Sequence, residues 1–230
     1  MKTRYRLAIF DLDGTLLDTI LDLAAATNAA LAANGYPARS VDEVRSFVGD
    51  GTKKLIARAV PSGTGESNIA RVHADFIAYY TAHSADRTAP YAGVLELLAT
   101  LRARGVKTAV LSNKVDHATR ALCDRYFEGL LDVVAGEREG EGIPKKPAPD
   151  GVFEIMRTAN VTAEEAVYIG DSEVDIKTAR NAGVDEILVS WGFRDVALLR
   201  QNGAKTIVST TKELGELIVG EPKTHLSQSS

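Results

Sequence analysis

The chain reads Leu7-Ala8-Ile9-Phe10-Asp11-Leu12-Asp13-Gly14-Thr15 near its beginning, and this stretch decides the fold. Four consecutive apolar residues predict a short strand buried on both faces, as in a parallel sheet. Two acidic residues follow at positions 11 and 13. In extended backbone these two side chains point the same way, whereas Leu12 between them points toward the core. The stretch therefore predicts a buried parallel strand that carries a pair of carboxylates at its carboxyl end.

Five further apolar runs resemble this strand, and helical patterns separate several of them. The predicted strands are Val106–Leu111, Val133–Ala135, Ala166–Ile169, Glu186–Val189 and Thr206–Val208. The predicted helices are Gly93–Arg104, the segment through Tyr126 with Asp116 as its N-cap, and Glu173–Ala182. Strands that alternate with helices imply right-handed crossovers. We therefore predict an α/β fold with a doubly wound parallel sheet.

One segment breaks the alternation. From Asp18 to about Ala85 every pattern is helical, and Ile20, Leu23, Ala24, Thr27 and Leu31 share one helix face. Helical patterns continue over Glu43–Phe47, Thr52–Val60 and Ile69–His83. We predict an inserted helical domain over residues 18–85, and a core built from residues 1–17 and 86–230.

Composition narrows the possible partners. The 230 residues are 45% hydrophobic and 25% charged, an ordinary globular balance, and the net charge is −4. An acidic chain is poorly suited to nucleic acid, because binding to it depends on neutralising phosphates. No apolar run approaches the length of a membrane span, and the single Cys123 can form no internal disulfide. We expect a cytoplasmic protein, monomeric or homodimeric, with a polar disordered tail over His225–Ser230.

Polar residues follow the predicted strands. Ser112-Asn113-Lys114 follows the second strand, Gly170-Asp171-Ser172-Glu173-Val174-Asp175 follows the fourth, and Lys145-Lys146-Pro147 lies in a loop between them. Ligands bind at the carboxyl ends of the strands in such sheets, so we expect these side chains to converge. Clustered carboxylates suit Mg²⁺, which prefers hard oxygen ligands and binds substrate phosphate. One carboxylate could attack phosphorus and another could move protons, while hydroxyls and a lysine hold the phosphoryl oxygens.

These four segments, in this order, resemble the four motifs of the haloacid dehalogenase superfamily. The motifs are Asp11-Leu12-Asp13-Gly14-Thr15, Ser112, Lys146-Pro147 and Gly170-Asp171-x-x-x-Asp175. The helical insertion after the first motif resembles the C1-type cap of that superfamily. The resemblance implies a Rossmann-like core, Mg²⁺ as cofactor and phosphoryl transfer through an aspartyl-phosphate.

The resemblance also implies roles for the first motif. Asp11 would be the nucleophile and a metal ligand. Asp13 would be the general acid and base, and its backbone carbonyl would bind the metal. Thr15 would lie near the phosphate and position Asp13.

Roles for the later motifs follow in the same way. Ser112 would bind the phosphoryl group with Asn113 beside it, and Asp171 would be a metal ligand. Asp175 would lie behind the ligands, although an ordinary ion pair or cap contact fits it equally well. The family lysine could be Lys145 or Lys146, and the proline that follows favours Lys146.

Within the superfamily, the first motif and much of the insertion resemble phosphoglycolate phosphatases. The matching positions are Asp22-Leu23, Asn28, Gly49-Asp50-Gly51, Leu55 and Arg58-Ala59. Pyrophosphatases and sugar-phosphate phosphatases share much of this pattern and remain alternatives. Leu23 stands where phosphomutases of the family place a histidine, which disfavours a mutase, and Asp13 disfavours a dehalogenase. A receiver-like signalling domain that accepts a phosphoryl group is the non-enzymatic alternative.

Two further segments have weaker interpretations. Lys53 and Lys54 follow a glycine-bracketed turn at a helix start, where they could contact a substrate carboxylate, although a solvated turn is the simpler interpretation. Trp191-Gly192-Phe193-Arg194 follows a strand and is expected to pack and turn rather than bind substrate. The expected substrate is a small phosphorylated metabolite.

Overall fold

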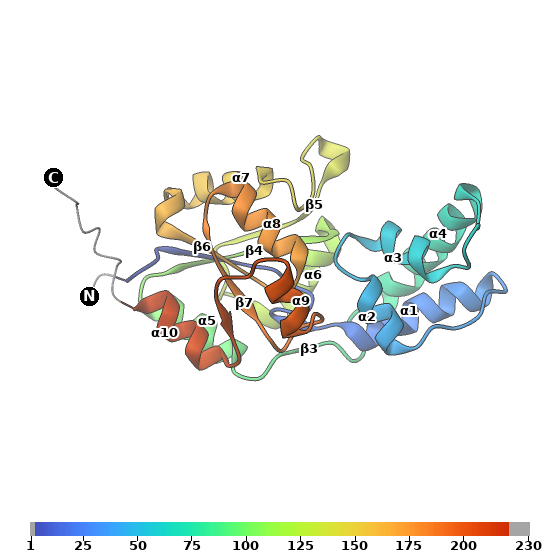
Figure 1. Ribbon diagram of the computed structural model, residues 1–230, viewed down its shortest axis with the longest axis horizontal. Coiled ribbons are helices and arrows are strands. Elements are labelled where there is room, and N and C mark those ends of the chain that lie inside the picture. The colour runs from blue at the N-terminus through green and yellow to red at the C-terminus, as the bar shows by residue number, and fades with distance from the viewer. Residues whose placement is uncertain (1–2, 221–230) are drawn as a thin grey trace.

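Residues 7–10 form the predicted strand, and five further parallel strands extend the sheet on both sides of it (Figure 1). The computed structural model describes residues 3–220. The strands, in spatial order, are β5 (Val133–Glu137), β4 (Lys107–Val115), β1 (Leu7–Phe10), β6 (Ala166–Gly170), β7 (Asp185–Val189) and β8 (Ile207–Val208). Every neighbouring pair is parallel, which confirms the predicted doubly wound α/β fold.

Helices cover both faces of the sheet, so that β1 is buried on both sides. Leu7 and Ile9 pack in one apolar cluster with Val152 and Ile155, whereas Phe10 packs in another with Leu98 and Leu122. The helices are α5 (Val94–Ala103), α6 (Asp116–Phe127), α7 (Asp150–Ala159), α8 (Glu173–Ala182), α9 (Val196–Gln201) and α10 (Thr211–Val219), with short 3₁₀ turns at Glu139–Glu141 and Ala163–Glu165.

The predicted helix over Glu173–Ala182 is confirmed to the residue, and Gly183 ends it in a left-handed conformation. The predicted N-cap at Asp116 is wrong. Val115 is the cap, because the strand β4 continues past its predicted end, and the Asp116 carboxylate instead accepts a hydrogen bond from the Gly136 N–H at 2.8 Å.

Four helices lie between the two short strands β2 (Leu17–Asp18) and β3 (Ala89–Pro90), which pair antiparallel. They are α1 (Ile20–Ala33), α2 (Val41–Phe47), α3 (Thr52–Ala59) and α4 (Glu66–His83). Their apolar residues form a cluster of their own, and Leu31, Val44, Ile56 and Phe76 are fully buried in it. Figure 1 shows these helices at one end of the molecule, beyond the edge of the sheet where β4 and β6 end. The helical run is as predicted.

Two remaining expectations concern the rest of the chain. Cys123 is buried in α6, and burial raises the pKa of its thiol to about 12, which fits an inert packing residue. Among residues 3–220, no helix is both long and apolar enough to cross a bilayer. The predicted disorder of His225–Ser230 concerns residues outside those described.

Asp22 joins the four helices to the segment that returns to the sheet. Its carboxylate, on α1, accepts hydrogen bonds from the backbone N–H groups of Arg87 and Thr88 and from the Thr88 hydroxyl, at 2.8 to 3.1 Å. The side chain is 1% exposed. Buried donors that lose their acceptor pay the full cost of desolvation, so this carboxylate stabilises the connection.

We predict that Asp22→Ala lowers the free energy of unfolding by about 3 kcal/mol in urea denaturation, because three donors lose their acceptor. Asp86→Ala is the matched control, because Asp86 is an exposed neighbour paired with His83, and it should cost less than about 1 kcal/mol. Equal stability of Asp22→Ala and the wild type would contradict the assigned role.

Candidate active site

The carboxyl ends of β1, β4 and β6 meet at the centre of the sheet. Phe10 is paired with Val110 of β4 and with Ile169 of β6, so the residues that follow lie at one level. The strand order changes direction at β1, because the chain moves to β4 and β5 on one side and to β6, β7 and β8 on the other. Such a switch point is where doubly wound sheets bind ligands.

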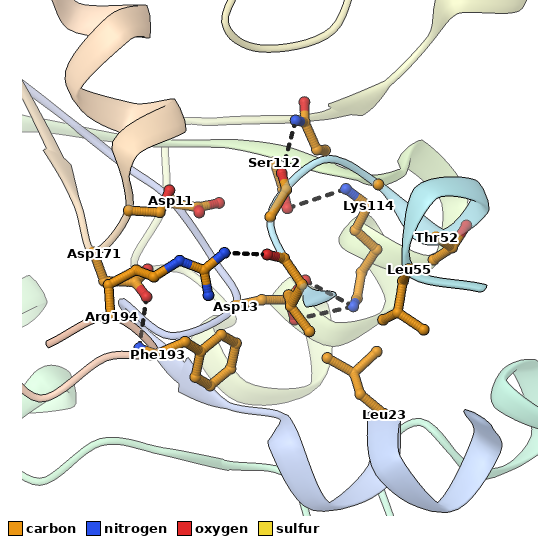
Figure 2. Close-up of a pocket in the computed structure, with 15 residues that line it drawn as sticks. Asp11, Asp13, Leu23, Thr52, Leu55, Ser112, Lys114, Asp171, Phe193 and Arg194 are labelled. Atoms are coloured by element: carbon orange, nitrogen blue, oxygen red, sulfur yellow. Dashed lines mark hydrogen bonds and ion pairs between the residues drawn. The ribbon is translucent and has the colours of Figure 1, made fainter. Parts of the chain in front are cut away.

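A pocket lies at this edge, between the sheet and the inserted helices (Figure 2). The sheet side contributes Asp11, Asp13, Ser112, Asn113, Lys114, Asp171, Ser172, Phe193 and Arg194, and the inserted segment contributes Leu23, Val48, Gly49, Gly51, Thr52 and Leu55. The pocket spans about 550 Å³, part of it open to solvent. The space therefore suits a small ligand.

Lys146 joins two of the carboxylates. Its Nζ lies 2.9 Å from Asp11 Oδ1 and 2.8 Å from Asp175 Oδ1, and the residue is 4% exposed. Lys145 instead reaches Glu139 at 2.9 Å, nearer the surface. The geometry thus favours Lys146 over Lys145 as the lysine beside Asp11.

Asp171 completes a cluster of carboxylates. One oxygen each from Asp11, Asp171 and Asp175 lies within 4.8 Å of the others. The two oxygens of Asp171 are oriented separately, by the Thr15 hydroxyl at 2.9 Å and by the Phe193 N–H at 2.8 Å. Thr15 was expected to position Asp13, but its hydroxyl donates to Asp171.

Asp175 has a different environment from the other two. Besides Lys146, its carboxylate accepts from the Ser172 hydroxyl at 2.7 Å, from the Ser172 and Asp171 N–H groups, and from the Tyr168 hydroxyl at 3.3 Å. The exchange with Ser172 is a capping box at the start of α8. Both oxygens are thus already bound by protein donors, which suits a residue that holds the site in place.

The cluster carries more negative charge than one lysine balances. Burial raises the pKa of Asp11 well above its ordinary range, Lys146 opposes this rise, and Asp175 and Asp171 add to it. Burial and then Asp175 raise the pKa of Asp171 to about 7. Burial alone would lower the pKa of Lys146, but Asp11 and Asp175 outweigh burial and raise it. Mg²⁺ prefers hard oxygen donors that carry uncompensated negative charge, and the carboxylates of this cluster therefore fit that ion.

Two glycines make room for Asp171. A Cβ on Gly14 would lie 2.5 Å from Asp171 Oδ2, and one on Gly192 would lie 2.2 Å from Asp171 Cβ. Gly14 also has a φ of +85°, in the left-handed region. Gly14 thus lets the chain pass close beside the Asp171 carboxylate.

Lys114 is a site residue whose role the sequence did not reveal. Its Nζ donates to both oxygens of Asp13 at 2.9 Å, and its side chain is 3% exposed. Burial alone would lower the pKa of Lys114, but Asp13 and Tyr80 together outweigh burial and raise it. The order Ser112-Asn113-Lys114 was the available signal, but sequence alone does not show which way alternating side chains face.

Asn113 connects the sheet to the inserted segment. Its Nδ2 donates to the carbonyl oxygens of Gly49 and Lys146, each at 3.0 Å. Its Oδ1 is buried and has no hydrogen-bond partner among residues 3–220. The neighbouring Ser112 is 3% exposed and lines the pocket, and its Oγ accepts from the Lys114 N–H at 3.3 Å.

The segment after β7 does more than the expected packing and turning. Trp191 Nε1 donates to the Thr15 carbonyl at 3.1 Å, whereas Phe193 and Arg194 line the pocket. Arg194 reaches Glu173 at 3.0 Å and donates to the carbonyls of Arg45 at 2.9 Å and Val48 at 2.6 Å. Contacts with distant backbone carbonyls leave no pattern in the sequence, which is why this arginine was missed.

The two lysines predicted for the inserted segment lie away from the pocket. Lys53 and Lys54 are exposed, and Lys54 Nζ lies 3.6 Å from Asp50. The neighbouring Thr52 lines the pocket in their place, and its hydroxyl lies 2.8 Å from His73 Nε2. The structure therefore does not bring Lys53 or Lys54 to the carboxylates.

Known proteins are similar to this chain in sequence and in fold. The chain is 31% identical over 220 residues to a phosphoglycolate phosphatase of Pseudomonas fluorescens, which covers 91% of this chain and 78% of that protein. A crystal structure from Lactobacillus delbrueckii subsp. bulgaricus, assigned provisionally as a phosphoglycolate phosphatase, matches with a TM-score of 0.90 at 39% identity, covering 96% of this chain and 100% of that one. CbbY from Rhodobacter sphaeroides, in complex with phosphate, matches with a TM-score of 0.70 at 27% identity, covering 92% and 96%.

A family model provides the most direct assignment. The model for haloacid dehalogenase-like hydrolases matches residues 8–189, a range that contains every carboxylate and lysine of the site described above. The chain therefore belongs to the haloacid dehalogenase-like hydrolases.

Proposed function

We propose that this protein hydrolyses small phosphate monoesters with Mg²⁺ through an aspartyl-phosphate on Asp11, and that 2-phosphoglycolate is its preferred substrate. One observation supports this most directly. The buried ammonium of Lys146 lies 2.9 Å from Oδ1 of Asp11, and Asp11 lines the pocket. A cation beside a carboxylate at such a place can bind a phosphoryl group and direct it to that carboxylate.

Asp11 is prepared for attack by its hydrogen bonds. Its Oδ1 accepts from the Leu12 N–H at 2.7 Å and from Lys146, and no donor among residues 3–220 is recorded on Oδ2. In the proposed first step Oδ2 bonds to phosphorus and the ester P–O bond breaks. The leaving oxygen takes a proton from Asp13, and Lys146 and the Ser112 hydroxyl hold the phosphoryl oxygens.

The second step restores the enzyme. Asp13 takes a proton from water, the water oxygen bonds to phosphorus, and the bond between phosphorus and Asp11 breaks to release phosphate. Mg²⁺, held by the carboxylates of Asp11 and Asp171 and by the Asp13 carbonyl, would neutralise charge on the transferred group. Thr15 positions Asp171 in this scheme, and Asn113 joins the Lys146 loop to the Gly49 segment.

The inserted helices form the proposed cap over residues 18–85. They supply the apolar side chains of Leu23 and Leu55 and the hydroxyl of Thr52 to the far side of the pocket. This wall excludes water from the first step. Leu23 stands where phosphomutases of the family place a histidine. An apolar side chain that faces the pocket cannot transfer protons, which supports phosphatase activity over phosphomutase activity.

The substrate is proposed from the names of the relatives and the size of the pocket. Phosphoglycolate is among the smallest phosphate esters, and the pocket of about 550 Å³, part of it open to solvent, can hold a ligand of this size. We expect a screen of phosphate esters with Mg²⁺ to give the highest kcat/KM for 2-phosphoglycolate. A preference for pyrophosphate or for a sugar phosphate would reject this substrate while leaving the mechanism standing.

The role of Asp11 is tested by Asp11→Asn, which removes the nucleophile at constant shape. We predict that kcat falls by about 10³-fold or more, with an unchanged circular dichroism spectrum. Asp124→Asn is the control, since Asp124 is exposed on α6, and it should keep full activity. Substantial turnover by Asp11→Asn would reject Asp11 as nucleophile.

Metal binding should depend on pH. In the folded metal-free protein burial raises the pKa of Asp171 from an ordinary 3.8 to about 7. Between pH 3.8 and pH 7 the folded state therefore binds a proton that the unfolded state does not. The free energy of unfolding falls as the pH rises through this range. Mg²⁺ must displace that proton. We predict that saturating Mg²⁺ raises Tm more at about pH 8 than at about pH 5.5.

Asp171→Asn is the control for this experiment, because it removes both the proton site and a ligand. The difference between the two pH values should shrink in this variant. A Tm gain that is equal at both pH values in the wild type, or larger at the lower one, would contradict a metal site that includes Asp171.

A further inference from the structure

Two cationic side chains line the pocket within the described residues, and they are held very differently. Each of the three guanidinium nitrogens of Arg194 contacts protein: Nε reaches Glu173, Nη1 the Arg45 carbonyl and Nη2 the Val48 carbonyl. Arg194 thereby fastens the end of α2 to the core. A side chain bound on all sides by the protein is poorly placed to bind a ligand.

Lys114 is held by a single anion. Its Nζ donates to both oxygens of Asp13 at 2.9 Å, and no other carboxylate among residues 3–220 pairs with it. The ring of Tyr80, from α4 of the inserted segment, lies 4.7 Å from the ammonium and shields it from water. Lys114 is 5% exposed, so its charge depends on Asp13 rather than on solvent.

The proposed mechanism removes that partner. Asp13 must turn its carboxylate toward the ester oxygen, beside Asp11, to move the proton. Figure 2 shows Lys114 on the opposite side of Asp13, next to Leu23, Thr52 and Leu55 and away from Asp11 and Asp171. A buried ammonium that loses its only carboxylate is strongly destabilised, and another anion must take its place.

The substrate can supply this anion. With its phosphoryl group at Asp11, the rest of the ester extends past Asp13 toward the inserted helices, where Lys114 lies. We infer that Lys114 exchanges the Asp13 carboxylate for a carboxylate of the substrate. Lys114 would thereby select phosphate esters that carry a carboxylate on the same carbon atom as the phosphate ester. This inference rests on the proposed function and assigns its substrate recognition to a residue of the core.

The test compares two esters of similar size. 2-Phosphoglycolate carries a carboxylate where 2-hydroxyethyl phosphate carries a neutral hydroxymethyl group. The measured quantity is the ratio of their kcat/KM values with Mg²⁺. A ratio taken within one protein sample does not depend on the fraction of it that is folded, so a destabilised variant still reports on recognition.

We expect the wild type to prefer phosphoglycolate, and Lys114→Met to lower the ratio about 10- to 100-fold, the effect of losing one charge-assisted hydrogen bond in a buried site. Lys114→Gln, which can still donate a hydrogen bond to Asp13, should lower it similarly. Lys177→Met, at an exposed lysine of α8, is the matched control and should keep the wild-type ratio.

Three results would overturn the inference. One is a wild-type enzyme that hydrolyses both esters equally well. Another is an equal loss of both activities in Lys114→Met, which would mean that Lys114 only positions Asp13. The third is a ratio that collapses in Arg194→Gln but not in Lys114→Met. Failure of the wild type to hydrolyse either ester is a different result, because it rejects the proposed function itself.

Discussion

The site depends on one buried ion pair network, in which the Lys146 ammonium lies between Asp11 and Asp175. It connects the end of β1 to the start of α8, because Asp175 also forms the capping box with Ser172. Buried carboxylates are tolerated only when they are paired and hydrogen-bonded, and Asp175 alone receives hydrogen bonds from four residues. Removing one charge from such a network leaves the others uncompensated, so its members act as a unit.

The charges of the site explain its need for a cation. Asp11, Asp13, Asp171 and Asp175 face only Lys146 and Lys114 in this network, so two negative charges are left over when all four carboxylates are ionised. Burial raises the pKa values of Asp11 and Asp171, and the neighbouring carboxylates raise them further. A divalent cation would balance this excess and leave Lys146 available to a phosphoryl group. Lys114 stays paired with Asp13 until Asp13 turns toward the ester oxygen, and in the proposed scheme it then pairs with the substrate anion.

Sequence reasoning succeeded where local pattern and topology suffice. The buried run Leu7–Phe10 predicted the central strand, and strand-end positions predicted that Asp11, Ser112 and Asp171 would line one pocket. It failed where contacts depend on the approach of distant segments. Arg194 binds the backbone carbonyl of Arg45 in α2, and the Thr15 hydroxyl donates to Asp171. Asp116 is not the helix N-cap, because β4 extends to Val115 and Val115 is the cap. The division at residues 18 and 85 stays a prediction, although four helices with their own core lie between β2 and β3.

The central claim is that Asp11 carries the phosphoryl group during turnover. Rapid mixing of enzyme, Mg²⁺ and 2-phosphoglycolate, followed by borohydride quenching, converts an aspartyl-phosphate into homoserine, which peptide mass spectrometry locates. The proposed mechanism predicts homoserine at position 11, only when substrate is present. Homoserine at Asp13 instead, or none at any aspartate under conditions of active turnover, would contradict it.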